Sequence, residues 1–298
     1  MTNQYPAIFS LLLLSFLTTL SFGQNRKNVV KIEPEIITYK TIDTISLELE
    51  IYRPLDFDKS KTYKAVVFYH GGGWNGGKPK LFRRQAMYFA SRGMITICPE
   101  YRLKNIHGTT PFECVKDAKS AFRYIRKNAK DLNIDPDWIA AGGGSAGGHL
   151  AAVLGNIEGL DERDEDHLIS IIPEALLLFN PVFDNGPNGY GYRRVKDRHL
   201  EISPIHNISK GAPPTIVFLG TEDKLIPVST AEDYKLKMEG VGSRCDLHLY
   251  EGVGHAFFAK PPVKYFVETT YQSDLFLISL GFLDNKPTIY EQYGQLKE

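Results

Sequence analysis

Residues 139–154 read IAAGGGSAGGHLAAVL, in which an apolar run, a glycine-rich turn and a helical sequence follow one another. Gly143, Ser145 and Gly147 fit the pattern GxSxG. This pattern places a serine on a sharp strand-to-helix turn, where small flanking residues keep a strained backbone free of collisions. The hydroxyl then projects beside a helix N-terminus, whose free N–H groups favour developing negative charge. Ser145 is therefore a candidate nucleophile.

A glycine-rich turn after a strand also occurs in phosphate-binding and dinucleotide-binding proteins. The phosphate loop does not fit, because the Lys of GxxxxGK[ST] is absent downstream. The dinucleotide pattern is weakened by the lack of a well-placed acidic residue about 20 positions further on. Since GxSxG alone is common, the function of this turn has to be inferred from the neighbouring strands and motifs.

Buried strands and amphipathic helices alternate along the chain. Continuous apolar runs predict strands buried on both faces at residues 65–69, 95–98, 175–179 and 215–219. Alternation of apolar and polar residues predicts half-exposed strands at residues 45–52, which we expect to be the first strand, and at 246–250. Helical spacing of apolar residues covers 81–92, 115–129, 146–154, 230–239 and 266–280.

This alternation predicts an α/β fold with a mostly parallel central sheet and helices on both faces. Ligands of such sheets gather beyond the carboxyl ends of the strands. The motifs that directly follow a predicted strand are therefore the first candidates for a functional site.

One such motif, His70-Gly71-Gly72-Gly73-Trp74, follows the strand at residues 65–69. An enzyme of acyl transfer needs backbone N–H donors aimed at the oxyanion of a tetrahedral intermediate, and glycines allow that close approach. A loop of this kind accompanies GxSxG in the nucleophile-elbow pattern. We expect the N–H groups of Gly72, Gly73 and Ala146 to form the oxyanion hole.

Two further motifs follow strands and supply partners for Ser145. Asp223 lies in GTED, after the strand at 215–219, and His255 lies in GHAF, after the strand at 246–250. His255 would act as general base and then acid, and the Asp223 carboxylate would fix its tautomer. Glu222 is the alternative acid. The chain order is serine, acid, histidine.

Together, HGGGW, GGSAGG, GTED and GHAF resemble the α/β-hydrolase superfamily. They resemble in particular the hormone-sensitive-lipase-like carboxylesterases and the related bacterial acetyl and feruloyl carbohydrate esterases. The resemblance implies structural supports in residues 99–103 and in the helix that carries Asp117. Lipase-like members have GDSAGG, whereas position 144 is Gly here, and residues 74–78 resemble the loop of the carbohydrate-esterase branch.

The resulting hypothesis is an α/β-hydrolase fold without a large cap domain that works as a serine esterase and needs no cofactor. Its substrate would be a small-molecule or glycan ester with an acetyl or feruloyl-type acyl group. Two alternatives are a serine peptidase of the same fold and a non-catalytic binding module. Residues 184–202 are the candidate for a lid, or an ordinary surface loop.

Composition excludes several other classes. With 35 Lys and Arg against 35 Asp and Glu among 298 residues, the formal charge is zero, which does not suit a nucleic-acid partner. The chain lacks CxxC and HExxH, so no metal site is expected. Cys98, Cys114 and Cys245 allow at most one disulfide. The acidic run 161–166 predicts a solvated loop, with calcium binding as the alternative.

Residues 8–22 read IFSLLLLSFLTTLSF. This run is shorter than the roughly 20 residues of a membrane span and suits a secretory signal. We predict a signal peptide at residues 1–23, cleavage after Gly23, and a catalytic domain at 24–298. The protein would then be secreted or periplasmic, with no stable membrane insertion. An uncleaved membrane anchor is the alternative.

Overall fold

The computed structural model describes Met1 and residues 31–294. Within them, one eight-stranded sheet has the order β1-β2-β4-β3-β5-β6-β7-β8. The strands are β1 Glu35–Ile42, β2 Ile45–Tyr52, β3 Tyr63–Tyr69, β4 Ile95–Pro99, β5 Ile134–Gly144, β6 Leu176–Phe179, β7 Thr215–Gly220 and β8 Cys245–Tyr250. Strand β2 pairs antiparallel with β1 and β4, and all other neighbours are parallel.

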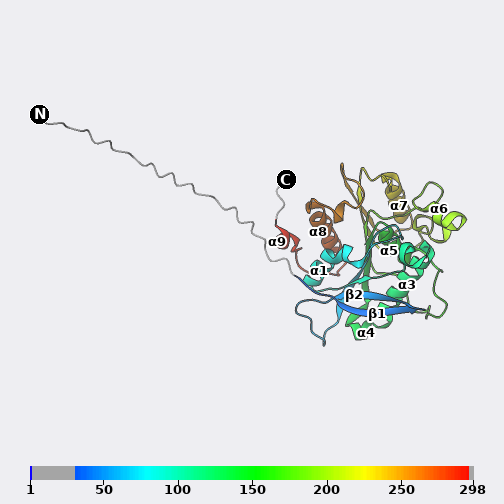
Figure 1. Ribbon diagram of the computed structural model, residues 1–298, viewed down its shortest axis with the longest axis horizontal. Helices are drawn as coiled ribbons and strands as arrows, with labels where there is room; N and C mark the ends of the chain where they lie inside the picture. Colours follow the sequence, from blue (N-terminus) through cyan, green and yellow to red (C-terminus); the bar gives the residue numbers. More distant parts are fainter. Residues whose placement is uncertain (2–30, 295–298) are drawn as a thin grey trace.

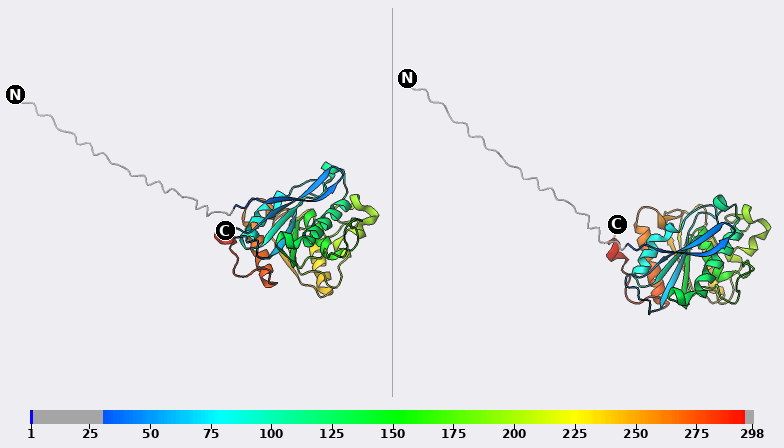
Figure 2. Two further views of the ribbon diagram at one scale, coloured as in Figure 1. Left: turned by 90° about the horizontal axis from the view of Figure 1, so that it is seen from below. Right: turned by 60° about the horizontal axis from the view of Figure 1, so that its bottom comes forward.

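Helices cover both faces of this sheet (Figure 1). One face carries α1 Arg83–Ser91, α8 Lys264–Ser279 and α9 Ile289–Tyr293, and the other carries α3 Pro111–Lys127, α5 Ala146–Asn156 and α7 Val228–Gly240. Figure 2 shows the twisted sheet running between these two layers. The shorter helices are α2 Lys104–His107, α4 Ala129–Leu132, α6 Tyr192–Val195, η1 Pro79–Phe82, η2 Lys196–Glu201, η3 Pro204–His206 and η4 Phe257–Ala259.

Helix α3 illustrates how local sequence sets these elements. Thr110 and Glu113 form a reciprocal capping box, and Pro111 occupies the first helical position, where its missing N–H costs nothing. Val115 and Phe122 lie on the buried stripe that the helical spacing predicted. The cap therefore determines where the helix begins, and the stripe determines which face meets the sheet.

The predicted fold class is confirmed, and each predicted strand and long helix has a counterpart. The expectation that residues 45–52 form the first strand is wrong, because β1 precedes them. In β1 only Tyr39 is buried, so its sequence EIITYKTI lacks the apolar signal of a core strand. Antiparallel pairing with β2 across a tight turn stabilises it instead.

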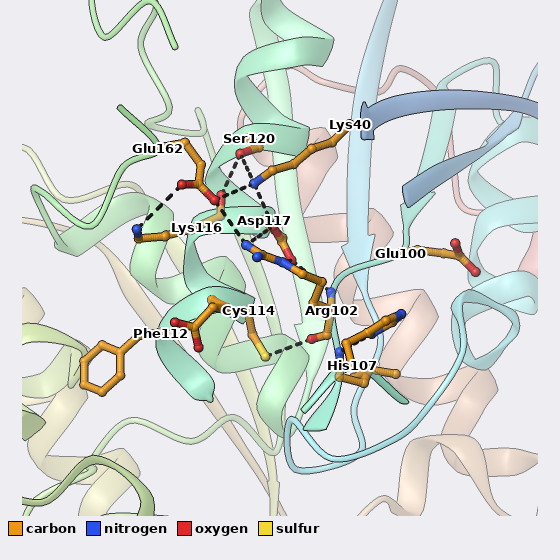
Figure 3. Close-up of polar contacts among 12 residues, drawn as sticks. Lys40, Glu100, Arg102, His107, Phe112, Cys114, Lys116, Asp117, Ser120 and Glu162 are labelled. Atoms are coloured by element: carbon orange, nitrogen blue, oxygen red, sulfur yellow. Dashed lines mark hydrogen bonds and ion pairs between the residues drawn. The ribbon is translucent and has the colours of Figure 1, made fainter. Parts of the chain in front are cut away.

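A buried ion-pair network joins β1, α3 and the loop that follows β4 (Figure 3). Asp117 Oδ1 accepts hydrogen bonds from Lys40 Nζ at 2.7 Å and Arg102 Nη2 at 2.8 Å, and Oδ2 accepts from Arg102 Nε at 2.7 Å. Glu162 Oε1 accepts from the same two cations at 2.9 and 3.1 Å. The expectation of a solvated acidic loop at 161–166 is therefore wrong for Glu162, and it is also wrong for Asp161 and Glu165, which both pair with the buried Arg123.

This network anchors a loop that supports the glycine-rich segment after β3. The Arg102 backbone N–H also donates to Asp117 Oδ2, at 2.9 Å. Next to it, the Tyr101 hydroxyl donates to the His70 carbonyl at 2.7 Å. Lys104 N–H donates to the Trp74 carbonyl at 3.0 Å. The charged cluster thus holds the backbone of this glycine-rich segment in place.

We expect Asp117→Ala to lower the free energy of unfolding by about 3–5 kcal/mol, because it leaves the largely buried Lys40 and Arg102 cations without their main counter-charge. Denaturant unfolding at neutral pH measures this. Asp164→Ala, in an exposed position of the acidic run, is the matched control and should change stability by less than about 0.5 kcal/mol. Similar small losses in both variants would show that the network is not a stabilising anchor.

Candidate active site

Ser145 occupies the turn between β5 and α5 with φ 55° and ψ −119°, a conformation that side-chain-bearing residues rarely adopt. The start of α5 lies so close to β3 that a Cβ atom on Gly147 would be 2.0 Å from the Tyr69 carbonyl oxygen, so only glycine fits there. Ser145 N–H donates to the Phe179 carbonyl of β6 at 2.9 Å, which extends the sheet hydrogen bonding into the turn. Strain of this kind is retained where function requires an exposed hydroxyl.

The structure brings the three predicted side chains together at one end of the sheet. His255 Nε2 lies 2.9 Å from Ser145 Oγ, and His255 Nδ1 lies 2.7 Å from Asp223 Oδ2. The other carboxylate oxygen of Asp223 accepts the N–H groups of Leu225 and Ile226 at 2.9 and 3.1 Å. Two contacts in series thus join Ser145, His255 and Asp223, and two backbone N–H groups hold the carboxylate. A proton on Nδ1 then leaves the Nε2 lone pair facing Ser145 Oγ, as a general base requires.

Asp223, and not Glu222, takes the acid position. The Asp223 side chain is fully buried behind the imidazole, whereas Glu222 is exposed. The His255 side chain is 20% exposed, so its Nε2 edge faces a cleft that a substrate can enter. Burial of the carboxylate strengthens its interaction with any imidazolium that forms.

The predicted oxyanion residues lie around this serine. Gly72 and Gly73 line a cavity of about 590 Å³ together with Ser145 and His255. In the described part of the chain, the N–H groups of Gly72 and Gly73 donate no hydrogen bond to another protein atom. Ala146 is the first residue of α5, so its N–H has no acceptor within the helix. These donors are free for a ligand, and their role as oxyanion hole stays a prediction.

Two buried histidines flank the site as structural groups. Burial lowers the pKa of His70 to about 4, and its Nδ1 lies 2.8 Å from the Gly71 carbonyl oxygen. Burial also lowers the pKa of His149 to about 4, and its Nε2 lies 2.7 Å from the Ile202 carbonyl oxygen. Both imidazoles are neutral at pH 7. The His70 ring stacks on Tyr101, and the His149 ring packs edge-on against Trp74, so both support the glycine-rich loop.

Residues 184–202 pack against the glycine-rich loop and form one wall of the cavity. Tyr190 lines the cavity, and its ring centroid lies 5.8 Å from that of Trp74. The Arg194 guanidinium donates a hydrogen bond to the Gly73 carbonyl. The segment therefore shapes the cleft as it stands, and its movement as a lid stays a prediction.

Gly144, the departure from GDSAGG, has a steric cause in this chain. A Cβ atom there would lie 2.6 Å from Cζ of Phe258, which follows His255 on the same loop. Phe258 also packs against Phe82 and Phe179, with ring centroids 5.4 and 4.9 Å away. The aromatic ring thus occupies the space that an aspartate would need.

Gly144→Asp should therefore cost about 1–3 kcal/mol of folding free energy and displace the loop that carries His255. We expect a lower melting temperature and a reduced turnover of p-nitrophenyl acetate. Adding Phe258→Ala to Gly144→Asp removes the collision and should restore part of the turnover. If Gly144→Asp alone leaves both measurements unchanged, the ring does not restrict position 144.

Asn180 is a residue of the site that motif analysis missed. It is fully buried, lines the cavity, and its Nδ2 lies 3.4 Å from His255 Nε2. The sequence did hold a signal, because Asn180 directly follows the predicted strand at 175–179, as Ser145, Asp223 and His255 follow theirs. An asparagine is neither nucleophile, base nor acid, so the motifs for those three roles do not include it.

Other ligand classes have no counterpart in the described residues. No group of three or more His, Cys, Asp or Glu side chains there could hold a metal ion. None of the helices between residues 31 and 294 is long and apolar enough to cross a membrane. Cys98, Cys114 and Cys245 are buried free thiols. The predicted signal peptide lies outside the described residues.

The parallel sheet, the serine on its sharp turn and the histidine–aspartate pair define a hydrolase of the α/β class. Comparison with known proteins supports this. The family model BD-FAE matches residues 49–172, and the model of the Dienelactone hydrolase family matches residues 189–274. Esterase 2 of Thermogutta terrifontis, in a structure phosphonylated by cyclosarin, is 40% identical with a TM-score of 0.81, covering 85% of this chain and 96% of that one. The chain therefore belongs to the α/β-hydrolase superfamily of serine esterases.

A second structure of the Thermogutta terrifontis enzyme, with butyrate bound, is 38% identical with a TM-score of 0.81, covering 85% of this chain and 96% of that one. Among curated relatives, an acetylxylan esterase of Xylanibacter ruminicola is 27% identical over 214 residues, which is 65% of this chain and 41% of that protein. The chain spans about half the length of the curated relatives it matches.

Proposed function

We propose that this chain is an exported serine esterase that hydrolyses short-chain acyl esters, of the acetyl or feruloyl type, on polysaccharides. The observation that carries the proposal is the hydrogen-bonded series from Ser145 Oγ through His255 to Asp223, with distances of 2.9 and 2.7 Å. A serine hydroxyl is a weak nucleophile by itself, and an adjacent oriented base is what activates it.

In the first half of the reaction, Ser145 Oγ attacks the ester carbonyl while its proton moves to His255 Nε2. The carbonyl oxygen becomes an oxyanion that the N–H groups of Gly72, Gly73 and Ala146 stabilise; loss of one such donor costs roughly 100- to 1000-fold in rate. The C–O bond to the alcohol then breaks, and the leaving oxygen takes the proton from Nε2. Asp223 stabilises the imidazolium that forms between these steps.

In the second half, water replaces the alcohol. It attacks the acyl carbon of the Ser145 ester while His255 Nε2 takes one of its protons. The bond between the acyl carbon and Ser145 Oγ breaks, and the proton on Nε2 returns to Oγ. The products are the free acid and the starting enzyme, and no cofactor takes part.

The choice of a short acyl group rests on the cavity and on the relatives. A volume of about 590 Å³ suits a small acyl group together with part of its alcohol. Structures of Thermogutta terrifontis esterase 2 hold propionate and butyrate, and the Xylanibacter ruminicola relative is an acetylxylan esterase. The glycan and feruloyl parts of the proposal rest on the resemblance of residues 74–78 to carbohydrate esterases.

Ser145→Ala should abolish hydrolysis, with a loss on the order of 10⁵- to 10⁶-fold in kcat, because no other group at the turn can form the acyl-enzyme. The measurement is acid release from p-nitrophenyl acetate, longer p-nitrophenyl esters, acetylated xylan and a feruloylated oligosaccharide. Ser60→Ala, at an exposed position, is the control and should behave as the wild type.

Each outcome of this panel has a distinct meaning. Turnover in Ser145→Ala at the wild-type rate would contradict the mechanism. Activity on p-nitrophenyl acetate without activity on the two glycans would support the proposed esterase activity and contradict the proposed polysaccharide substrate. If the well-folded wild type hydrolyses none of the esters, the proposal is contradicted and the peptidase or the binding module is favoured. Hydrolysis of a peptide-amide substrate would then indicate the peptidase, and its absence the binding module.

Export predicts a mature chain that begins at Gln24. Expression of the full chain in a secreting bacterial host, followed by mass spectrometry of the purified protein, tests the cleavage site. We expect the mass of residues 24–298. A membrane-bound product of full-length mass would instead support the uncleaved anchor.

A further inference from the structure

Asn180 lies at the centre of the catalytic end of the sheet. It directly follows β6, whose neighbours are β5, which leads to Ser145, and β7, which leads to Asp223. The Asn180 backbone N–H donates to the Phe218 carbonyl of β7 at 2.7 Å. The residue is therefore held by the same sheet that positions the nucleophile and the acid.

The side chain of Asn180 makes two contacts, both with the loop that carries His255. Its Oδ1 accepts the Ala256 backbone N–H at 3.2 Å, and its Nδ2 lies 3.4 Å from His255 Nε2. Since a backbone N–H can only donate, the contact with Ala256 fixes which end of the amide is oxygen. The amide N–H therefore points at Nε2, and it can donate there only while Nε2 is unprotonated.

Asn180 has an unusual backbone conformation and is fully buried beside His255. Asn180 has φ 37° and Ala256 has φ 61°, both in the left-handed region that residues other than glycine rarely occupy. Asn180 has no exposed surface, so water does not compete for its amide. Strained residues that persist beside a catalytic group are candidates for a role in the reaction.

We propose that Asn180 is a positioning residue that holds the free-base imidazole of His255 in place during the second half of the reaction. The inference rests on the proposed esterase function. It assigns to Asn180 a task that Ser145 performs in the resting enzyme but cannot perform once it is acylated.

The reason is the change of donors around His255 Nε2. In the resting enzyme, Ser145 Oγ–H donates to Nε2 at 2.9 Å, a shorter contact than the 3.4 Å to Asn180. In the acyl-enzyme, Oγ is an ester oxygen without a proton. Among the described side chains, the Asn180 amide is then the one donor in contact with Nε2, while Asp223 holds only the Nδ1 side. Lys260 Nζ contacts the His255 carbonyl and not the ring.

The contact is broken while Nε2 carries a proton and forms again when the proton leaves. When water attacks the acyl carbon, its proton moves to Nε2, and the new N–H then faces the N–H of Asn180. Two donors cannot bond to each other, so the imidazolium gains nothing from Asn180. Transfer of that proton to Ser145 Oγ, as the bond between Oγ and the acyl carbon breaks, restores the favourable contact.

Asn180→Gly tests the proposal, because glycine tolerates the positive φ and removes both side-chain contacts. Stopped-flow hydrolysis of p-nitrophenyl acetate gives the burst rate, which reports acylation, and the steady rate, which reports deacylation. We expect deacylation to slow roughly five- to tenfold, as for one lost hydrogen bond, with acylation unchanged. In steady state, kcat and KM then fall together and kcat/KM stays constant.

Asn180→Asp separates the donor from the loop contact. A carboxylate keeps the shape and the acceptor for Ala256 N–H, but it cannot donate to Nε2. We therefore expect it to slow deacylation at least as much as Asn180→Gly, measured on the pH-independent plateau of each variant. Wild-type deacylation in Asn180→Asp would overturn the proposal, because holding the loop would then suffice. An equal loss of both rates in Asn180→Gly would also overturn it.

Two controls distinguish a loss of folded protein from an effect on the reaction. Paraoxon phosphorylates Thermogutta terrifontis esterase 2, and stoichiometric p-nitrophenolate release from it should count the intact sites of each variant here. Asn128→Asp makes the same chemical change at the end of α3, and we expect wild-type kinetics from it. Absence of any p-nitrophenolate release by the well-folded wild type, in the burst and in the steady state, would contradict the proposed esterase function itself and not the specific role of Asn180.

Discussion

Helix α5 starts so close to strand β3 that the contact between Gly147 and the Tyr69 carbonyl leaves no room for a Cβ atom. This close approach compresses the turn between β5 and α5 and forces Ser145 into its strained conformation. The hydroxyl therefore leaves the sheet beside the free N–H groups of a helix N-terminus and within reach of His255. The strained turn is held in place because residues 139–144 of β5 are buried and pair with β3 and β6, and α5 is almost entirely buried.

The remaining parts of the site depend on loops, and each loop is held by contacts with another element. The buried Asp117 carboxylate fixes the segment around Arg102, which in turn bonds to the backbone of the glycine-rich loop. Phe258 packs into the space left open at Gly144 and ties the histidine loop to the serine turn. Asn180 bonds the same loop from β6. Loop positions are thus set by one buried charge, one aromatic ring and one buried amide.

Much of this arrangement could be predicted from residues alone. GxSxG, HGGGW and GTED follow continuous apolar runs, which are typical of buried parallel strands, and GHAF follows an alternating strand, so Ser145, Asp223 and His255 were expected to share one end of the sheet. Strand β1 could not be predicted, because its half-exposed residues acquire their conformation from pairing with β2. The ion pairs of Glu162 could not be predicted, because the acidic run says nothing about cations that come from β1 and from the segment after β4.

The amino-acid sequence alone therefore specified the class of fold, the chain order of the three proposed catalytic residues and the need for glycine beside the serine. These follow from local patterns, since periodicity, turn chemistry and residue type are properties of short segments. Tertiary structure decided which carboxylate meets His255, why position 144 excludes aspartate, and that Asn180 contacts His255. Those features depend on which segments, far apart in the chain, come within a few ångströms of each other, because hydrogen bonds and steric contacts act only at that range. Only the packing of the whole sheet brings those segments together.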